Sequence, residues 1–272
     1  MATQTITELQ ALEPAVLGIT SLKSRDRPPT PIPEHLSSSE AVAEPTTTLP
    51  RARAIIVITE LCGVLFFSSF CNGAIVVALP AMQHELHLQE GLLVWPTSSY
   101  YLTAGSCLLL AGSIADVAGT KRSNLVGSFL GAIFAMACGL AQTEGQLIAF
   151  RALQGITNAI IAPSAVSIIS NSVEEGQPRN MGFACMGFSQ PLGFGFGMVL
   201  AGVLTDTVGW RPTFYLAGAA SFAMFLVGIW ALPQDRRPGA GQSILKRLSQ
   251  EIDWVGVLLA SMGLAMLSYV LA

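Results

Sequence analysis

Charged residues are scarce in this sequence. Asp, Glu, Lys and Arg make up 11% of its 272 residues, whereas hydrophobic residues make up 51%. A soluble domain usually carries about 25% charged residues. This shortage excludes an ordinary water-exposed globular protein, and it implies that the long apolar segments are buried in a lipid bilayer.

The sequence also lacks the usual signs of nucleic-acid binding, metal binding and catalysis. The net charge is −3 and the basic residues occur in short, separated groups, so we expect no nucleic-acid partner. The five cysteines lie in apolar runs without CxxC spacing or a nearby histidine cluster. We interpret them as small buried hydrophobic residues, and we expect no metal and no bound cofactor. No nucleophile–base set is present, so we do not expect an enzyme.

Seven apolar segments are each long enough to cross about 30 Å of hydrocarbon. They are 54–79, 92–115, 124–142, 147–170, 181–204, 212–232 and 254–272. The residues before them are rich in Pro, Ser, Thr and Glu and have no periodic apolar face, which is typical of a disordered tail. We therefore predict four regions: a disordered cytoplasmic tail (1–50), a six-helix transmembrane bundle (51–232), a cytoplasmic loop between two bundles (233–253) and a seventh transmembrane helix (254–272).

The basic residues predict how the chain is oriented in the membrane. If the N-terminus is cytoplasmic, 12 of the 14 Lys and Arg residues fall on the cytoplasmic side. Only Arg211 lies on the other side, and Arg151 lies within a span. Because cytoplasmic loops carry an excess of Lys and Arg, we predict a cytoplasmic N-terminus.

A short charged turn between the second and third spans occurs twice in the chain. The five residues Gly112, Ile114, Asp116, Gly119 and Lys121 are matched, 90 residues later, by Gly202, Leu204, Asp206, Gly209 and Arg211. Each copy joins the end of one span to the start of the next. Because the offset covers three spans, the two copies face opposite sides of the membrane, which predicts two three-helix units of inverted topology.

These motifs resemble the major facilitator superfamily, in its drug:H⁺ antiporter branch. The turn at 112–122 resembles the cytoplasmic signature G-x-L-a-D-x-x-G-R-[KR], and 147–158 resembles the fourth-helix pattern l-x-x-x-R-x-x-q-G. The segment 71–80, which ends V-A-L-P, resembles the first-helix motif, and 95–103 resembles the second helix of fungal members with fourteen spans. The resemblance implies an all-α polytopic membrane protein, in which this chain forms the six-helix N-terminal bundle and the first helix of a truncated second bundle.

The resemblance assigns two further groups of residues. The gating motif of the turn comprises Gly112, Asp116, Gly119, Lys121 and Arg122. The fifth-helix motif of antiporters, g-x-x-x-G-P-x-x-G-G, corresponds to Gly187, Pro191, Gly193 and Gly197. The chain departs from the family pattern at Val117 and Thr120, where basic residues are usual, and at Gln190, where the motif has glycine.

Glu60 and Arg151 are the two ionisable residues that lie clearly inside the first six spans. An ionisable group in a span is costly and is a functional candidate by default. The resemblance implies that Arg151 takes part in proton coupling; the alternative is a structural arginine held by backbone carbonyls. Glu60 is either a proton carrier or a side chain that reaches cytoplasmic water from two turns inside its helix, and we favour the second interpretation slightly.

Polar side chains within the spans are candidates for lining a substrate cavity. The candidates are Asn72, Tyr100, Gln154, Asn158 and Gln190. Ordinary hydrogen bonding between helices is the alternative for each of them.

The function implied is export of an amphipathic small molecule, such as a drug or secondary metabolite, driven by a proton gradient. The partners would be the small-molecule substrate, protons and the bilayer of the plasma membrane, with the vacuolar membrane as the alternative. Two other functions stay open: an uptake or ion transporter of the same superfamily, and a transport-inactive membrane protein that acts as a partner or regulator. If the chain is complete, it would need a second half or a dimer partner to close the cavity.

Overall fold

The structure is a computed structural model that describes residues 50–86, 90–233 and, singly, 256, 259, 261–264 and 266. The side chains of Glu90 and Asp116 are outside this description. Our predictions for the tail (1–50), for the loop between bundles (233–253) and for most of the seventh span (254–272) therefore concern residues that lie almost entirely outside the described ranges.

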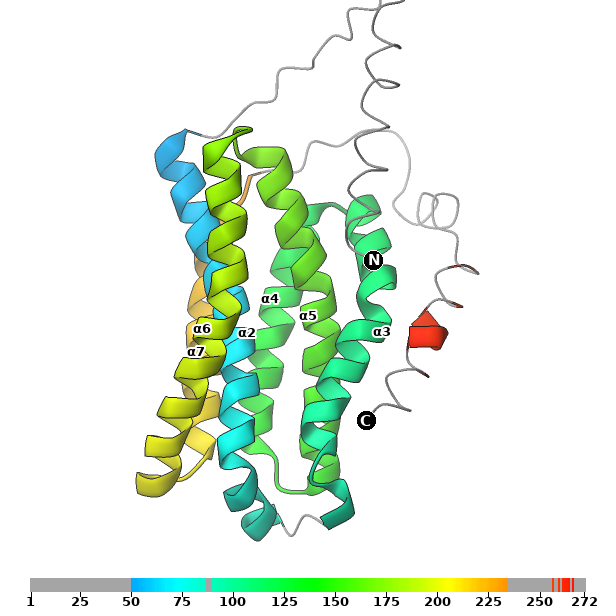
Figure 1. Ribbon diagram of the computed structural model, residues 1–272, viewed down its shortest axis with the longest axis vertical. Helices are drawn as coiled ribbons and strands as arrows, with labels where there is room; N and C mark the ends of the chain where they lie inside the picture. Colours follow the sequence, from blue (N-terminus) through cyan, green and yellow to red (C-terminus); the bar gives the residue numbers. More distant parts are fainter. Residues whose placement is uncertain are drawn as a thin grey trace, which may run out of the picture. The chain divides into compact units, whose positions relative to one another are not determined.

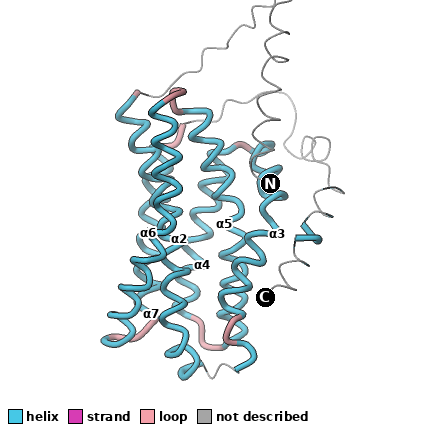
Figure 2. The backbone as a smooth tube through the Cα atoms, viewed as in Figure 1, coloured by secondary structure: helices cyan, strands magenta, loops and turns pink. Residues whose placement is uncertain are grey.

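The described chain is built from helices, and no strand occurs within it (Figures 1 and 2). The elements are α2 (Arg51–Leu86), η2 (Glu90–Leu92), α3 (Trp95–Ala118), α4 (Thr120–Leu140), α5 (Glu144–Ser172), α6 (Gln177–Thr207) and α7 (Arg211–Ala231). Each of the first six predicted spans coincides with one of the α-helices. Helices are required in hydrocarbon because they satisfy all of their backbone polar groups internally.

Five of the described helices are long and apolar enough to cross a membrane, namely α2, α4, α5, α6 and α7. The remaining helix, α3, has 24 residues and packs along α5. The chain is thus an all-α, multi-pass integral membrane protein, as predicted.

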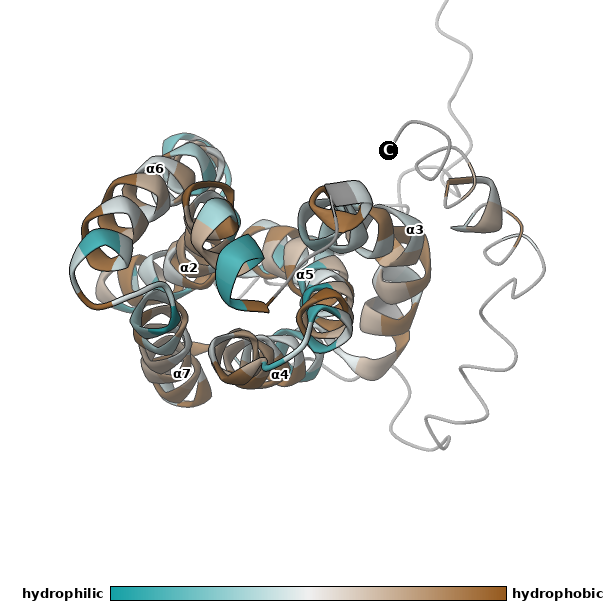
Figure 3. Cartoon of the chain, turned by 90° about the horizontal axis from the view of Figure 1, so that it is seen from below, coloured by the Kyte–Doolittle hydropathy of each residue, from teal (hydrophilic) through white to brown (hydrophobic). Residues whose placement is uncertain are grey.

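The packing of the helices follows the internal repeat. The repeat relates α2 to α5 and α3 to α6. α2 packs mainly along α6, and in the same way α5 packs along α3. α4 and α7 are counterparts and pack against each other. Figure 3, which looks along the helices, shows α2 beside α6 and α7, and α5 beside α3 and α4. The two three-helix units therefore exchange partners reciprocally.

Each copy of the charged turn contains a glycine with a positive φ angle. Gly119 follows α3 with φ of 104°, and Gly209 precedes α7 with φ of 102°. Only glycine adopts such angles without a steric cost, so it is the residue that permits each abrupt reversal between antiparallel helices.

Candidate functional site

The candidate site is built around the contact between α3 and α5. A Cβ atom on Gly155 would collide with the carbonyl oxygen of Tyr100 and the hydroxyl of Thr103. Thr103 Oγ1 in turn donates a hydrogen bond of 2.8 Å across the interface to the carbonyl of Ala152. The missing side chain at Gly155 therefore lets the two backbones approach closely and brings Tyr100 next to Arg151, one turn away on α5.

Arg151 is fully buried, and all of its hydrogen-bond acceptors are neutral. Its Nε donates to the carbonyl of Pro96 at 3.2 Å, and its Nη1 donates to Gln154 Oε1 at 2.6 Å. Nη2 donates to Asn72 Oδ1, and the guanidinium carbon lies 4.6 Å from the centre of the Tyr100 ring. Arg151 forms no ion pair with any residue in the described ranges, so its charge is balanced by dipoles and a ring face alone.

The network extends from Tyr100 toward α2 and back to α5. The Tyr100 hydroxyl lies 3.0 Å from Ser68 Oγ, and Ser68 Oγ donates to Asn158 Oδ1 at 3.2 Å. Since Ser68 gives its proton to Asn158, Tyr100 is the donor in the first of these bonds. Side chains of α2, α3 and α5 are thereby tied together around one buried cation.

Four of the five predicted cavity residues belong to this network. Asn72, Tyr100 and Gln154 contact Arg151 directly, and Asn158 joins through Ser68. Gln190 does not belong to it, because its side chain is exposed on the surface of α6. Ser68 was missed by the sequence analysis, although it precedes Asn72 by four residues and so shares its helix face.

A small cavity adjoins the network between α2, α4, α5 and α7. Its volume is about 20 Å³, and polar groups from Ser68, Ser128, Gln154, Thr157 and Ser221 contribute to its lining. The buried hydroxyl of Ser128 has no hydrogen-bond partner among the described residues. A cavity of this size with several polar partners accommodates one water molecule.

Glu60 lies apart from this network, at the contact of α2 with α7. Its side chain is fully buried, and neither carboxyl oxygen has a hydrogen-bond partner in the described part of the chain. A Cβ on Gly228 would lie only 2.8 Å from Glu60 Oε1 and 3.2 Å from Leu125 Cδ2. The interpretation that Glu60 reaches cytoplasmic water is therefore wrong: the space left by Gly228 admits the carboxyl group into the bundle.

The residues of the predicted gating motif are spread along α3 and the start of α4. Lys121 Nζ donates a 2.7 Å hydrogen bond to the carbonyl of Leu232, which follows α7. Arg122 is exposed, and Gly112 is in ordinary contact with Pro163, at 3.9 Å from a built Cβ. The side chain of Asp116 lies outside the described residues.

The fifth-helix motif divides between two faces of α6. Gly193 and Gly197 are buried against α2, where a Cβ on either would collide with the carbonyl oxygen of Phe66 or Phe70. Gly187 and Pro191 are exposed instead, and a Cβ on Gly187 would meet no atom within 4 Å. The two buried glycines thus bring α6 and α2 together, in the same way that Gly155 brings α5 and α3 together.

Comparison with known proteins places this architecture in a family. The profile of the Major Facilitator Superfamily matches residues 61–272. The chain is 35% identical to MFS-type transporter 1 of Pyricularia oryzae over 82% of its own length and 40% of the relative. It is 31% identical to a puromycin resistance protein of Streptomyces alboniger over 74% of its length and 38% of the relative.

A third relative is the low affinity ammonium transporter of Saccharomyces cerevisiae, with 30% identity over 66% of the chain and 35% of the relative. The chain thus spans less than half the length of each of these curated relatives. The match to the family profile nevertheless covers most of the chain and includes all of α3 to α7. The chain therefore belongs to the major facilitator superfamily.

Proposed function

We propose that the chain forms part of a proton-coupled secondary transporter that exports amphipathic small molecules by alternating access. The observation that carries this proposal is the full burial of Arg151 among neutral groups. A permanent cation without a carboxylate partner favours the ionised form of an acid that comes close to it. It also attracts an anionic or strongly polar part of a substrate.

Glu60 is the proposed proton carrier. An ionised carboxylate without partners inside the bundle would bear a large desolvation cost, whereas a protonated carboxyl bears a much smaller one. Movement of α7 away from α2 would open the Gly228 contact to water and release the proton. In this proposal Glu60 binds protons near the end of α7, and the Arg151 network handles substrate and coupling near the start of α3.

Export is supported by the name of one relative. The Streptomyces protein is called a puromycin resistance protein, and the removal of a drug from the cell is a direct route to resistance. We propose the plasma membrane as the location, with a cytoplasmic N-terminus. The substrate path would run between this bundle and the remainder of the transporter.

The test is a transport assay on the full-length protein in vesicles with an imposed pH gradient. We expect Arg151→Ala to lower proton-driven substrate efflux at least about tenfold, because the interactions lost belong to a buried charged group with three acceptors. Arg179→Ala is the matched control, since Arg179 is a partly exposed arginine that pairs with exposed Glu175. Unchanged proton-driven efflux in Arg151→Ala, at equal protein levels, would remove Arg151 from the mechanism.

Uptake or ion transport is the second candidate, because another relative is named as an ammonium transporter. The two candidates are separated by supplying drug or ammonium outside the vesicles and imposing the pH gradient in either direction. Accumulation of ammonium without drug movement would favour the second candidate.

A further inference from the structure

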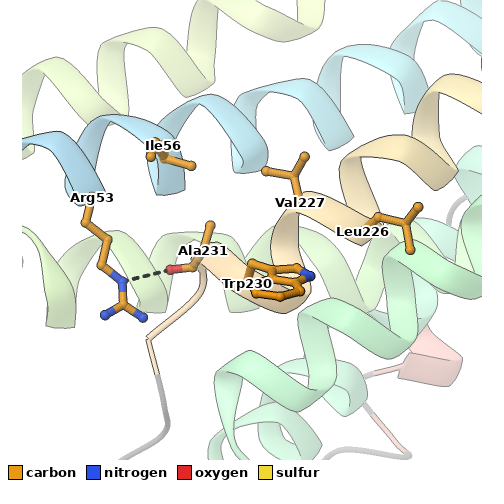
Figure 4. Close-up of a pocket in the computed structure, with 6 residues that line it drawn as sticks. All are labelled: Arg53, Ile56, Leu226, Val227, Trp230 and Ala231. Carbon is orange, nitrogen blue, oxygen red and sulfur yellow. Dashed lines mark hydrogen bonds between the residues drawn. The ribbon is translucent and has the colours of Figure 1, made fainter.

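An apolar groove lies between the first turns of α2 and the last turns of α7 (Figure 4). Its volume is about 470 Å³, within the range of about 300–1,000 Å³ that small-molecule ligands occupy. The groove is lined by Arg53, Ile56, Leu226, Val227, Trp230 and Ala231. Five of these six residues are apolar or aromatic, so the groove suits a hydrocarbon chain.

The charge in the groove is concentrated at one end. Arg53 Nε donates to the carbonyl of Ala231 at 3.4 Å, which holds the side chain across the end of α7. The two terminal nitrogens of Arg53 form no hydrogen bond or ion pair with a described residue, and the side chain is exposed. Lys121 donates to the next carbonyl, that of Leu232. The two cations outweigh the partial negative charge of about half a unit at the C-terminal end of α7, so an anion at this end would meet the hydrogen-bond donors of Arg53 and a net positive charge.

Trp230 forms one wall of the groove close to its charged end. Its side chain is 86% exposed on the surface of the bundle, although it belongs to the last turn of a membrane-spanning helix. Exposed tryptophan at this position is typical of the level of the lipid headgroups, where an apolar ring and a polar N–H are both accommodated. The groove thus runs from the headgroup level into the hydrocarbon.

We propose that this groove binds one anionic glycerophospholipid of the cytoplasmic leaflet. The lipid phosphate would accept hydrogen bonds from the terminal nitrogens of Arg53. One acyl chain would lie against Ile56, Leu226 and Val227. Basic pockets between helices at the cytoplasmic face are a recognised form of anionic lipid site. The proposal depends on the predicted orientation of the chain and is independent of the proposed transport activity.

Tryptophan quenching by brominated lipids tests this site. The full chain is reconstituted in phosphatidylcholine vesicles that contain the same mole fraction of either brominated phosphatidylserine or brominated phosphatidylcholine. The signal of Trp230 is the difference between the wild type and Trp230→Phe. We expect the affinity of the groove, read from the quenching of Trp230, to be about fivefold higher for phosphatidylserine than for phosphatidylcholine. The reason is that one arginine near an anionic lipid surface contributes about 1 kcal/mol. High salt should reduce this preference.

Substitutions at two neighbouring arginines identify the binding group. Arg53→Gln should bring the ratio of the affinities for phosphatidylserine and phosphatidylcholine close to one. Arg53→Lys keeps the charge and should retain most of the preference for phosphatidylserine. Arg51→Gln is the matched control, because Arg51 is also exposed at the start of α2 but does not line the groove. It should leave the preference unchanged.

Three results would overturn the proposal. Equal quenching by both lipids in the wild type would indicate ordinary lipid contact without a site. An unchanged preference in Arg53→Gln would place the anion elsewhere. If neither lipid quenched Trp230, the groove would be covered by another part of the protein.

Discussion

The ammonium group of Lys121, at the start of α4, donates a 2.7 Å hydrogen bond to the carbonyl of Leu232, beyond the end of α7. The counterpart of Lys121 in the second repeat is Arg211, at the start of α7, and its Nη1 donates at 3.2 Å to the carbonyl of Gly139 in the last turn of α4. The two antiparallel helices are therefore bound to each other at both ends by a cation on a C-terminal carbonyl. The negative end of the helix dipole favours a cation at each place.

Removal of the Lys121 contact should destabilise the bundle. We expect Lys121→Met to lower the free energy of unfolding by at least about 1 kcal/mol, since the aliphatic part of the side chain is retained and the charged hydrogen bond to Leu232 is lost. Thermal unfolding of the purified protein in detergent measures the change. Arg122→Met is the control: Arg122 is exposed, and its loss should have an effect within about 0.5 kcal/mol. Equal destabilisation by both substitutions would contradict the assigned role of Lys121.

The close contact of Gly155 with α3 predicts that position 155 does not tolerate a side chain. Gly155→Ala should lower the free energy of unfolding by about 1–3 kcal/mol. The new Cβ would meet the backbone of Tyr100 as well as the side chain of Thr103, so α3 and α5 must separate. It should also weaken the proposed transport, since α3 carries Tyr100 to Arg151. Gly187→Ala is a matched control in α6, where a Cβ meets nothing within 4 Å. There, alanine should be neutral or stabilising by up to about 1 kcal/mol because it favours the helix. A neutral Gly155→Ala would show that the helices are not held in close contact.

The pair Glu60 and Gly228 predicts strong coupling between two distant positions of the sequence. Gly228→Ala places a Cβ 2.8 Å from Glu60 Oε1, so the carboxyl group must move. In a Glu60→Ala background this clash is absent. Gly228→Ala should therefore lower the free energy of unfolding by about 0.5–1 kcal/mol less in this background than in the wild type. A double-mutant cycle of unfolding in detergent measures the difference. Additive effects would mean that Glu60 points elsewhere.

The Tyr100 hydroxyl and ring have separable roles in the Arg151 network. Tyr100→Phe removes the bond to Ser68 and keeps the ring on the guanidinium, whereas Tyr100→Leu removes both. We expect Tyr100→Phe to lower the free energy of unfolding by about 1 kcal/mol and Tyr100→Leu to lower it by at least about 2 kcal/mol. Substrate affinity and unfolding temperature, measured on both variants, check this order. The reverse order would show that the ring contact contributes little.

Much of the architecture could be predicted from the sequence, because it depends on local properties. Long apolar runs require helices in a bilayer, whatever their neighbours are. The positive φ angles at Gly119 and Gly209 reflect a turn motif that is visible in the sequence and recurs at a fixed spacing. Arg151 was identifiable as an unusual residue simply because a charge interrupts an apolar span.

The tertiary structure decided which side chains meet. In a soluble helix, an apolar stripe marks the buried face, but in a membrane protein the lipid-facing and protein-facing sides are both apolar, and periodicity no longer separates them. For this reason Ser68, which joins Tyr100 to Asn158, could not be singled out from the sequence, and the sequence did not show that Gln190 lies exposed on α6, outside the Arg151 network. Glu60 turns into the bundle only because Gly228, 168 residues later, has no side chain to exclude it. The sequence by itself determined the helices, their turns and their repeat; the pairing of helix faces determined the site.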